Sequence, residues 1–197
     1  MLFESSINLN LKGAEIIYYP NFFNMNVANN YFKRLLNNIE WQQDTITLFG
    51  KTHLQPRLTA FYANNKNTYK YSNIVMNPHR FKKDLLNIKK TIESELNTEF
   101  TSCLANLYRD GNDGMGWHAD NEKELGKNPI IASISFGAER NFHLKHKTNK
   151  NLKTKLVLQH GSLLLMQGET QSNWLHQLPK TKKTIGNRIN LTFRIIA

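Results

Sequence analysis

The second half of this sequence consists almost entirely of short segments with β-strand character, and this pattern limits the folds open to the chain. After Thr101, runs of β-branched, aromatic and alternating apolar residues recur, and turn-forming residues at 110–116, Gly137, 160–161 and Gly168 separate many of them. Short strands spaced by turns in this way are typical of a β-sandwich or barrel. The predicted strands are residues 103–108, 130–136, 141–146, 156–159, 162–166 and 188–196.

Two amphipathic stretches in the first half predict helices. Residues 24–39 and 79–96 repeat apolar side chains every three or four positions, which is the spacing of one helix face. Between them, residues 45–71 are rich in β-branched and aromatic residues and are broken by Gly50, Pro56 and an Asn-rich turn, which favours short strands and hairpins. We therefore predict an α+β protein in which helices pack against a double-sheet β core.

The length and the single cysteine place the chain in a broad class. A chain of 197 residues is long enough to form one domain with its own hydrophobic core. Cys103 is the only cysteine, so no intrachain disulfide can form and a reducing compartment is expected. No apolar run approaches the roughly 20 residues that cross a bilayer, and residues 1–10 lack the pattern of a signal peptide. We expect an intracellular protein with no membrane partner.

The charge balance indicates a polyanionic partner. Lys and Arg number 26 against 15 Asp and Glu, for a formal net charge of +11. An excess of this size raises the local concentration of polyanions and is common among nucleic-acid binders. The basic residues cluster at 80–83, 145–155 and 180–183, although a generically basic surface would look much the same.

A candidate metal site begins at His118 and Asp120. Residues two apart in an extended strand point to the same side, so this imidazole and this carboxylate can bind one ion together. A second histidine would complete the facial triad of non-haem Fe(II), which leaves further coordination positions open. The pair alone is a weak signal, because His-x-Asp is also common on protein surfaces.

Four later histidines could supply that second imidazole. His160 directly precedes Gly161 and has the character of a turn residue, while His143 and His146 lie in a basic stretch that favours exposure. His176 follows an apolar Trp-Leu pair, and this setting favours it modestly over the others.

The C-terminal strand alternates without a break. Its apolar residues share one face, and its other face carries Arg188, Asn190, Thr192 and Arg194. The two arginine positions lie about 20 Å apart along the strand at the usual rise per residue, but their long side chains could converge on one small anion. Guanidinium groups match carboxylates in bidentate fashion, so this face suits a dicarboxylate. The alternative is an edge strand with one solvated face.

The chain resembles the AlkB family of 2-oxoglutarate-dependent nucleic-acid dealkylases, and within it the type of animals and plants that repairs duplex DNA. The resemblance extends over about residues 49–196, some three quarters of the chain. It is carried by Phe49-Gly50-Lys51, Pro56-Arg57, Asn106-Leu107-Tyr108-Arg109-Asp110-Gly111, His118-Ala119-Asp120, Ser133-Ile134-Ser135-Phe136-Gly137, His160-Gly161-Ser162-Leu163-Leu164, His176-Gln177-Leu178-Pro179 and the arginine strand.

The resemblance implies a fold, cofactors and ligand-binding residues. It implies a jelly-roll (double-stranded β-helix) core formed by residues 101–197, with nucleotide-recognition elements and supporting helices in residues 1–100. It implies Fe(II), 2-oxoglutarate and O₂, with succinate, CO₂ and an aldehyde released as the base is dealkylated. The implied iron ligands are His118, Asp120 and His176, and the implied 2-oxoglutarate-binding residues are Asn106, Tyr108, Arg188, Asn190, Thr192 and Arg194.

The resemblance also implies how a damaged base is reached. A base inside a duplex must be flipped out, and an apolar wedge can fill the gap that it leaves. Phe49 occupies the position of the wedge, and Lys51 would lie near a phosphate. The implied substrate-binding residues are Phe49, Gly50, Lys51, Arg57, Tyr69, Tyr71, Asn121 and Glu122.

Asn121 departs from the family pattern, because the duplex-repair members commonly have a second acid directly after the iron-binding Asp. Asn keeps an acceptor but adds a donor and loses the charge. This change puts the preference for cationic lesions such as 1-methyladenine and 3-methylcytosine in doubt.

Three functions therefore compete. The first is oxidative repair of alkylated DNA by a monomeric enzyme, located in the nucleus of a eukaryote or the cytoplasm of a prokaryote. The second is the same chemistry on RNA or protein. The third is a nucleic-acid binding module without activity, which would have no need of the metal and dicarboxylate residues.

Overall fold

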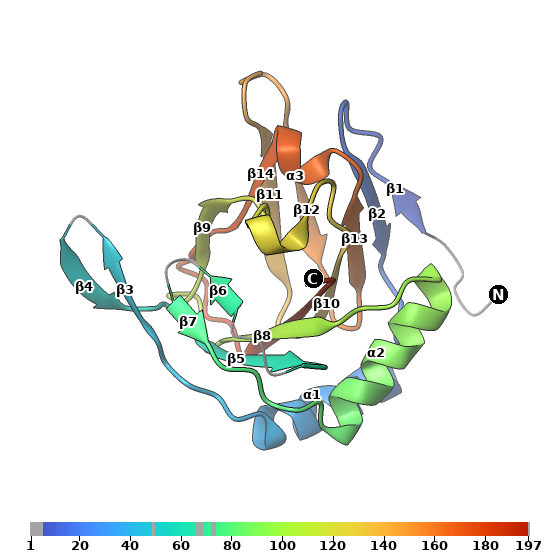
Figure 1. Cartoon of the computed structure of the whole chain (residues 1–197), viewed down its shortest axis with the longest axis vertical. Helices are drawn as coiled ribbons and strands as arrows, with labels where there is room; N and C mark the ends of the chain where they lie inside the picture. Colours follow the sequence, from blue (N-terminus) through green and yellow to red (C-terminus); the bar gives the residue numbers. More distant parts are fainter. Residues whose placement is uncertain (1–5, 49, 66–68, 72–73, 197) are drawn as a thin grey trace.

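The core of the computed structural model consists of two antiparallel β-sheets that face each other (Figure 1). The structure describes residues 6–48, 50–65, 69–71 and 74–196. The large sheet has the order β1-β2-β13-β10-β15-β8-β5, and the small sheet has the order β12-β11-β14-β9. With helices packed against the large sheet, this arrangement confirms the predicted α+β class with a jelly-roll core. None of the helices in the described ranges is long and apolar enough to span a membrane.

The strands of both sheets come from much of the chain. The large sheet consists of β1 (Ile7–Asn8), β2 (Glu15–Tyr19), β5 (Leu58–Ala63), β8 (Ser102–Tyr108), β10 (Ile131–Gly137), β13 (Leu163–Gln167) and β15 (Arg188–Arg194). The small sheet consists of β9 (Met115–His118), β11 (Arg140–His146), β12 (Lys153–Leu158) and β14 (Trp174–Leu178). The large sheet therefore includes strands that precede residue 101.

The six strands predicted after Thr101 are present, and the differences have physical reasons. β12 begins at Lys153 rather than at residue 156, because its lysines lie on an exposed face and hide the strand pattern. Four strands of the two sheets were not predicted: β1 and β2, which precede the first predicted element, and β9 and β14. β9 contains Gly116, which weakens strand propensity, and in β14 the adjacent polar residues His176 and Gln177 interrupt the apolar pattern.

Helix α1 (Met25–Asn38) begins and ends close to its predicted bounds, and the side chain of its N-cap residue Asn24 accepts a hydrogen bond from the backbone of Val27. Helix α2 (Lys83–Leu96) begins four residues later than predicted. The reason is that the backbone of His79 exchanges hydrogen bonds with β5 and cannot join the helix. A short helix α3 (Thr170–Asn173) precedes β14, and a 3₁₀ turn spans Lys123–Leu125.

The alternation in β15 divides its side chains between two environments. Ile189, Leu191 and Phe193 are buried in the cluster that also contains the apolar faces of α1 and α2. Arg188, Asn190, Thr192 and Arg194 point to the other side, toward the small sheet, and line a pocket. β15 lies between β10 and β8 in the middle of the large sheet, so the edge-strand alternative is wrong.

Two hairpins lie outside the sheets. β3 (Thr45–Leu48) and β4 (Lys51–Leu54) form a hairpin that extends away from the core at the left of Figure 1. β6 (Tyr69–Tyr71) pairs with β7 (Ile74–Met76). The β3–β4 hairpin and β6 fall within residues 45–71, where short strands and hairpins were predicted, whereas β7 lies just beyond that range.

His160 lies in the turn before β13, where both of its ring nitrogens contact other parts of the fold, and it is not part of the cluster that could bind a metal ion. Its Nδ1 accepts a hydrogen bond from the backbone N–H of Gly137 at 2.8 Å, and its Nε2 lies 3.1 Å from Oδ1 of Asn29. The ring also makes edge contacts with Phe32 and Phe136. An imidazole that accepts at one nitrogen and donates at the other must be neutral.

This arrangement predicts a pH-dependent contribution of His160 to stability. Burial lowers the pKa of His160 below its usual value of 6.5, so below that pH the unfolded chain binds the proton more readily than the folded chain does. The free energy of unfolding should therefore fall as the pH drops through about 6.5 and below. In His160→Gln, which keeps an acceptor but cannot be protonated, this part of the pH dependence should be missing. Urea unfolding of both proteins at about pH 7.5 and about pH 5.5 measures the difference, and equal losses of stability would contradict the assignment.

Candidate active site

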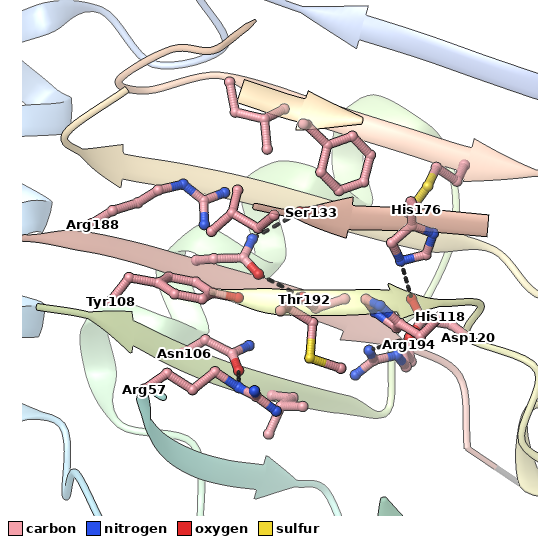
Figure 2. A pocket seen from close by; sticks show the side chains of 17 residues that line it. Arg57, Asn106, Tyr108, His118, Asp120, Ser133, His176, Arg188, Thr192 and Arg194 are labelled. Carbon is pink, nitrogen blue, oxygen red and sulfur yellow. Dashed lines mark hydrogen bonds and ion pairs between the residues drawn. The ribbon is translucent and has the colours of Figure 1, made fainter. Parts of the chain in front are cut away.

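A polar pocket lies between the two sheets and is lined by side chains from both (Figure 2). Asn106 and Tyr108 enter it from β8, two positions apart, as their alternation predicts. β15 supplies its four polar side chains, and Arg57, just before β5, lies beside them. Phe142, Leu158, Met166 and Leu178 form the apolar part of the wall.

His118, Asp120 and His176 meet at one end of this pocket. Their potential ligand atoms all lie within 4.8 Å of one another, and the two histidines are directly paired across β9 and β14. Asp120 is not in the same strand as His118, contrary to the prediction, because β9 ends at His118. The backbone N–H of Asp120 donates instead to Oε1 of buried Gln171 at 2.9 Å, which holds this carboxylate in place without a strand.

The other candidate histidines lie elsewhere. His143 points toward Gln177, with Nδ1 of the ring 3.4 Å from the amide nitrogen. His146 accepts hydrogen bonds from the backbone N–H groups of Thr148 and Asn149 in the hairpin between β11 and β12. Within the described residues, the cluster at His176 is the group of side chains suited to bind a metal ion.

The electrostatics of the cluster favour a cation. Burial lowers the pKa of His176 to about 3, and it also lowers the pKa of His118, so both rings are neutral near pH 7. Burial acts to raise the pKa of Asp120, but the charge of Arg194 and the neighbouring imidazoles outweigh it and lower this pKa to about 2. Two neutral imidazoles and an ionised carboxylate therefore present lone pairs to the same point, and this is the donor set of a facial triad.

The two arginines of β15 lie at opposite ends of the pocket (Figure 2). Arg194 is beside the metal-ligand candidates, where its Nη2 donates to Oδ1 of Asp120 at 2.8 Å. Arg188 is at the far end, where it donates to Oγ of Ser135 at 2.9 Å and lies over the ring of Tyr108.

Arg188 is a buried cation without a carboxylate partner among the described residues. It is 2% exposed, its Nε has no hydrogen-bond partner in the described part of the chain, and burial lowers its pKa to about 10. A buried charge is unfavourable unless it is paired. This end of the pocket therefore fits an anionic group, and a carboxylate matches the shape of the guanidinium.

Hydrogen bonds fix the polar side chains between these two ends. Asn190 donates to Oγ of Ser133 at 2.8 Å, and Thr192 donates to Oδ1 of Asn190 at 3.0 Å. Nε of Arg57 donates to Oδ1 of Asn106 at 2.9 Å, which sets the orientation of that amide. The polar surface of the pocket is thus held in one arrangement.

The predicted substrate-binding residues are only partly brought together. Arg57 is buried in the pocket, whereas exposed Asn121 and partly buried Glu122 directly follow Asp120. Gly50 and Lys51 are exposed at the tip of the β3–β4 hairpin. Phe49 lies outside the described residues, and for Tyr69 and Tyr71 the structure describes the backbone of β6 alone.

Several residues that line the pocket, or that hold the residues lining it, were given no role in the sequence analysis: Ser133 and Phe142 line the pocket, whereas Ser135 and Gln171 hydrogen-bond to Arg188 and Asp120. Ser133 and Ser135 alternate in β10 as Asn106 and Tyr108 do in β8, so their period of two could have revealed them. Phe142 stacks on the ring of His176 at 5.2 Å between centroids, and Gln171 supports Asp120 across 51 positions of sequence. No local pattern indicates these last two contacts.

Comparisons with known proteins agree with this geometry. A profile of the 2OG-Fe(II) oxygenase superfamily matches residues 15–194. Alpha-ketoglutarate-dependent dioxygenase alkB homolog 3 of Bos taurus is 40% identical over 191 residues, which is 93% of this chain and 66% of that protein. DNA oxidative demethylase ALKBH2 is 36% identical in Arabidopsis thaliana, across 93% of this chain and 67% of the relative, and 35% identical in Homo sapiens, across 90% and 72%.

The chain thus spans slightly less than two thirds of the length of the first of these relatives. Among solved structures, that of OsALKBH1 superimposes with a TM-score of 0.66, covering 91% of this chain and 97% of the other at 16% identity. At this identity the likeness concerns the fold.

Proposed function

Because the chain belongs to the 2OG-Fe(II) oxygenase superfamily and, within it, to the AlkB family, we propose that it removes alkyl groups from nucleobases by oxidation. The observation that carries this proposal is the pocket itself, with a His-Asp-His cluster at one end and, at the other, the buried cation Arg188, which forms no ion pair within the described part of the chain. Such a pocket suits an ion and a short dicarboxylate held between them.

Each polar residue of the pocket then has a role. His118, Asp120 and His176 would hold Fe(II), which with 2-oxoglutarate and O₂ supplies the oxidation of the carbon attached to the base nitrogen. Arg188 would bind the carboxylate of 2-oxoglutarate that is farther from the metal ligands. Arg194 would bind the carboxylate that is nearer to them. Asn106, Tyr108, Asn190 and Thr192 would line the path between, held by the hydrogen bonds described above.

The apolar wall keeps water away from the reacting atoms. Phe142 covers one side of His176, and Leu158, Met166 and Leu178 are all buried beside it. A dry wall strengthens the electrostatic contacts inside the pocket and limits side reactions. The chain would thereby protect the oxidising centre until a base enters.

The surface supports a nucleic-acid substrate. A net charge of +11 favours a polyanion, and Lys51 is exposed at the tip of the β3–β4 hairpin. Two of the relatives are named DNA oxidative demethylases. We take alkylated DNA, including duplex DNA, as the substrate, with RNA or protein as the alternative for the same chemistry.

The reaction class is tested with oligonucleotides that carry 1-methyladenine. The protein would be loaded with Fe(II) and 2-oxoglutarate without oxygen, exposed to O₂, and the product read by mass spectrometry. Loss of one methyl group that requires both additions is the expected result. Consumption of 2-oxoglutarate without change of the DNA would keep the oxygenase and point to another lesion, to RNA or to protein as the substrate. No turnover at all would favour a binding module.

Phe49 gives a sharper prediction about the substrate. If Phe49 fills the gap left by a flipped base, Phe49→Ala should lose activity on duplex DNA and largely keep it on single strands, because unstacking takes a few kcal/mol only in the duplex. A loss of about tenfold or more on the duplex is expected, since each 1.4 kcal/mol corresponds to a factor of ten.

Leu54→Ala is the matched control for Phe49. Leu54 is an apolar residue at the end of β4 and is 63% exposed, so its replacement removes exposed apolar surface from the β3–β4 hairpin without altering residues 49 and 50. Rates on paired duplex and single-strand substrates compare the two variants. Equal losses on both substrates in Phe49→Ala would contradict the wedge.

A further inference from the structure

The two strands that carry the candidate metal-binding histidines are joined by a short, irregular ladder. β9 and β14 pair at His176–His118 and at Leu178–Met115, and the register shifts between these two pairs. Gly116 and Trp117 of β9 thus lie opposite the single residue Gln177 of β14, which is a β-bulge. A bulge redirects the side chain that follows it and interrupts the hydrogen bonds that would hold the register. Other contacts must therefore keep His118 opposite His176.

Arg140 supplies such contacts from the neighbouring strand. It is the first residue of β11, is 4% exposed, and does not line the pocket of the metal-ligand candidates. Its Nη2 donates to the backbone carbonyls of Asp113 at 2.9 Å and Pro179 at 2.7 Å, and its Nη1 donates to that of Asp110 at 3.2 Å. One guanidinium thus binds both the loop that leads into β9 and the residue that directly follows β14.

The two loops are packed closely where Arg140 binds them. The backbone N–H of Thr181 donates to the carbonyl of Gly111 at 2.8 Å. A Cβ atom added to Gly114 would lie 2.7 Å from the carbonyl oxygen of Leu178, the last residue of β14. Only a glycine lets the backbones approach this closely. The far end of the bulged ladder is therefore a tight joint with Arg140 at its centre.

The guanidinium of Arg140 is suited to binding several backbone carbonyls at once. Its planar fork directs several N–H donors in fixed directions, which a lysine cannot reproduce. The guanidinium of Arg140 also lies 5.9 Å from the centroid of the Tyr108 ring. Arg188 lies over the same ring. Among the described residues no carboxylate lies within ion-pair distance of Arg140, and its buried charge is stabilised by the carbonyl oxygens that it holds and by the nearby negative charges of Asp113 and Asp110.

We propose that Arg140 is a positioning residue for the metal site. By clamping the loops at the far end of the bulged β9–β14 pair, it keeps the two imidazoles opposed and so sets the affinity for the metal ion, which it does not contact. This inference rests on the proposed function in that the ion is taken to be the Fe(II) of an oxygenase.

The test measures metal affinity directly, without turnover. The dissociation constants of Fe(II) under anaerobic conditions and of Co(II) would be measured by calorimetry for the unaltered protein, Arg140→Lys and Arg140→Gln. Residues that orient metal ligands from outside typically change affinity by about 10–100-fold when removed, and we expect a loss in this range. The visible absorption of bound Co(II) should change as well, because it reports the ligand geometry.

Lys89→Met is the matched control. Lys89 is also a buried cation, 8% exposed and paired with Glu93 at 2.6 Å, but it lies on α2 and away from the pocket. It should lower the melting temperature without changing metal affinity or the Co(II) spectrum. Arg140 variants that lose stability like Lys89→Met but bind metal like the unaltered protein would overturn the inference.

Gly114→Ala disturbs the same joint by another route and serves if the Arg140 variants do not fold. Its new Cβ would press on the carbonyl of Leu178, so a similar loss of affinity is expected; unchanged affinity in this variant would overturn the inference too. If the unaltered protein binds neither metal, the proposed function fails with it. If that protein binds metal and removes methyl groups, only the role of Arg140 is in question.

Discussion

Replacing His176 by alanine should remove metal binding and turnover together while the chain stays folded. His176 is buried at the end of the pocket, and its potential ligand atom lies within 4.8 Å of those of His118 and Asp120. A carboxylate and one imidazole alone do not form a facial triad. The loss of affinity should exceed about a hundredfold, the upper end of the effect of removing a residue that merely orients a ligand.

His143→Ala is the control for this variant. His143 lies one strand position from the pair Leu144–His176 but points to the other face of the small sheet, and its imidazole was a candidate ligand in the sequence. The His143→Ala variant should keep its metal affinity, and its circular dichroism spectrum should match that of His176→Ala. Titration with Fe(II) and single-turnover assays would be run on both variants.

Turnover, measured beside nucleic-acid affinity, separates an enzyme from a binding module. His176→Ala should keep its nucleic-acid affinity in either case, but only an oxygenase has a turnover that this variant loses. If His176→Ala still turned over at a comparable rate, the cluster would not be the metal site.

Replacing Arg188 by methionine should raise the stability of the protein without ligands and yet abolish its affinity for 2-oxoglutarate. Arg188 is a fully buried cation that forms no ion pair with the described residues, and methionine fills a similar volume without a charge. Replacing buried charges by apolar side chains is often stabilising, by about 1–4 kcal/mol. Losing the partner of a buried carboxylate, in contrast, costs about 2–5 kcal/mol of binding, or roughly 30- to 3000-fold in affinity.

Thermal unfolding with and without 2-oxoglutarate measures both effects in one experiment. A ligand at a hundred times its dissociation constant stabilises the folded state by about 2.7 kcal/mol, so the unaltered protein should melt higher when 2-oxoglutarate and metal are added. Arg188→Met should melt higher without ligand and gain little from it. Arg34→Met, on an exposed side chain of α1 that pairs with Asp84, should change neither value. A normal ligand-induced shift in Arg188→Met would contradict the role of Arg188.

Parts of this architecture that follow from local periodicity could be predicted from the sequence. The alternation of residues 188–194 indicated two faces, and both exist, because a strand in the middle of a sheet has no other way to distribute its side chains. Helices α1 and α2 could be predicted because their apolar residues recur at the spacing of one helix face. His160 was recognised as a turn residue from Gly161 beside it.

The rest depends on contacts between distant segments, which no local pattern encodes. The support of Asp120 by Gln171 and the three carbonyls held by Arg140 join residues 27 to 51 positions apart. β14 carries the second histidine, but His176 and Gln177 interrupt its apolar residues, whereas the equally short β13 was recognised from its run of leucines. The choice of His176 over the other histidines therefore needed either the family resemblance or the fold.

The two-sided use of β15 limits how this protein can change. A strand repeats every two residues, so the deletion of one residue would exchange its faces and turn the arginines toward the helices and the isoleucine toward the pocket. The same seven residues thus form part of the hydrophobic core and part of the pocket, so this segment should not tolerate insertions or deletions. The β3–β4 hairpin pairs with neither sheet and is free of this restriction. Length variation among descendants of this chain should collect in this hairpin, where we propose that the substrate binds, and leave β15 unchanged in length.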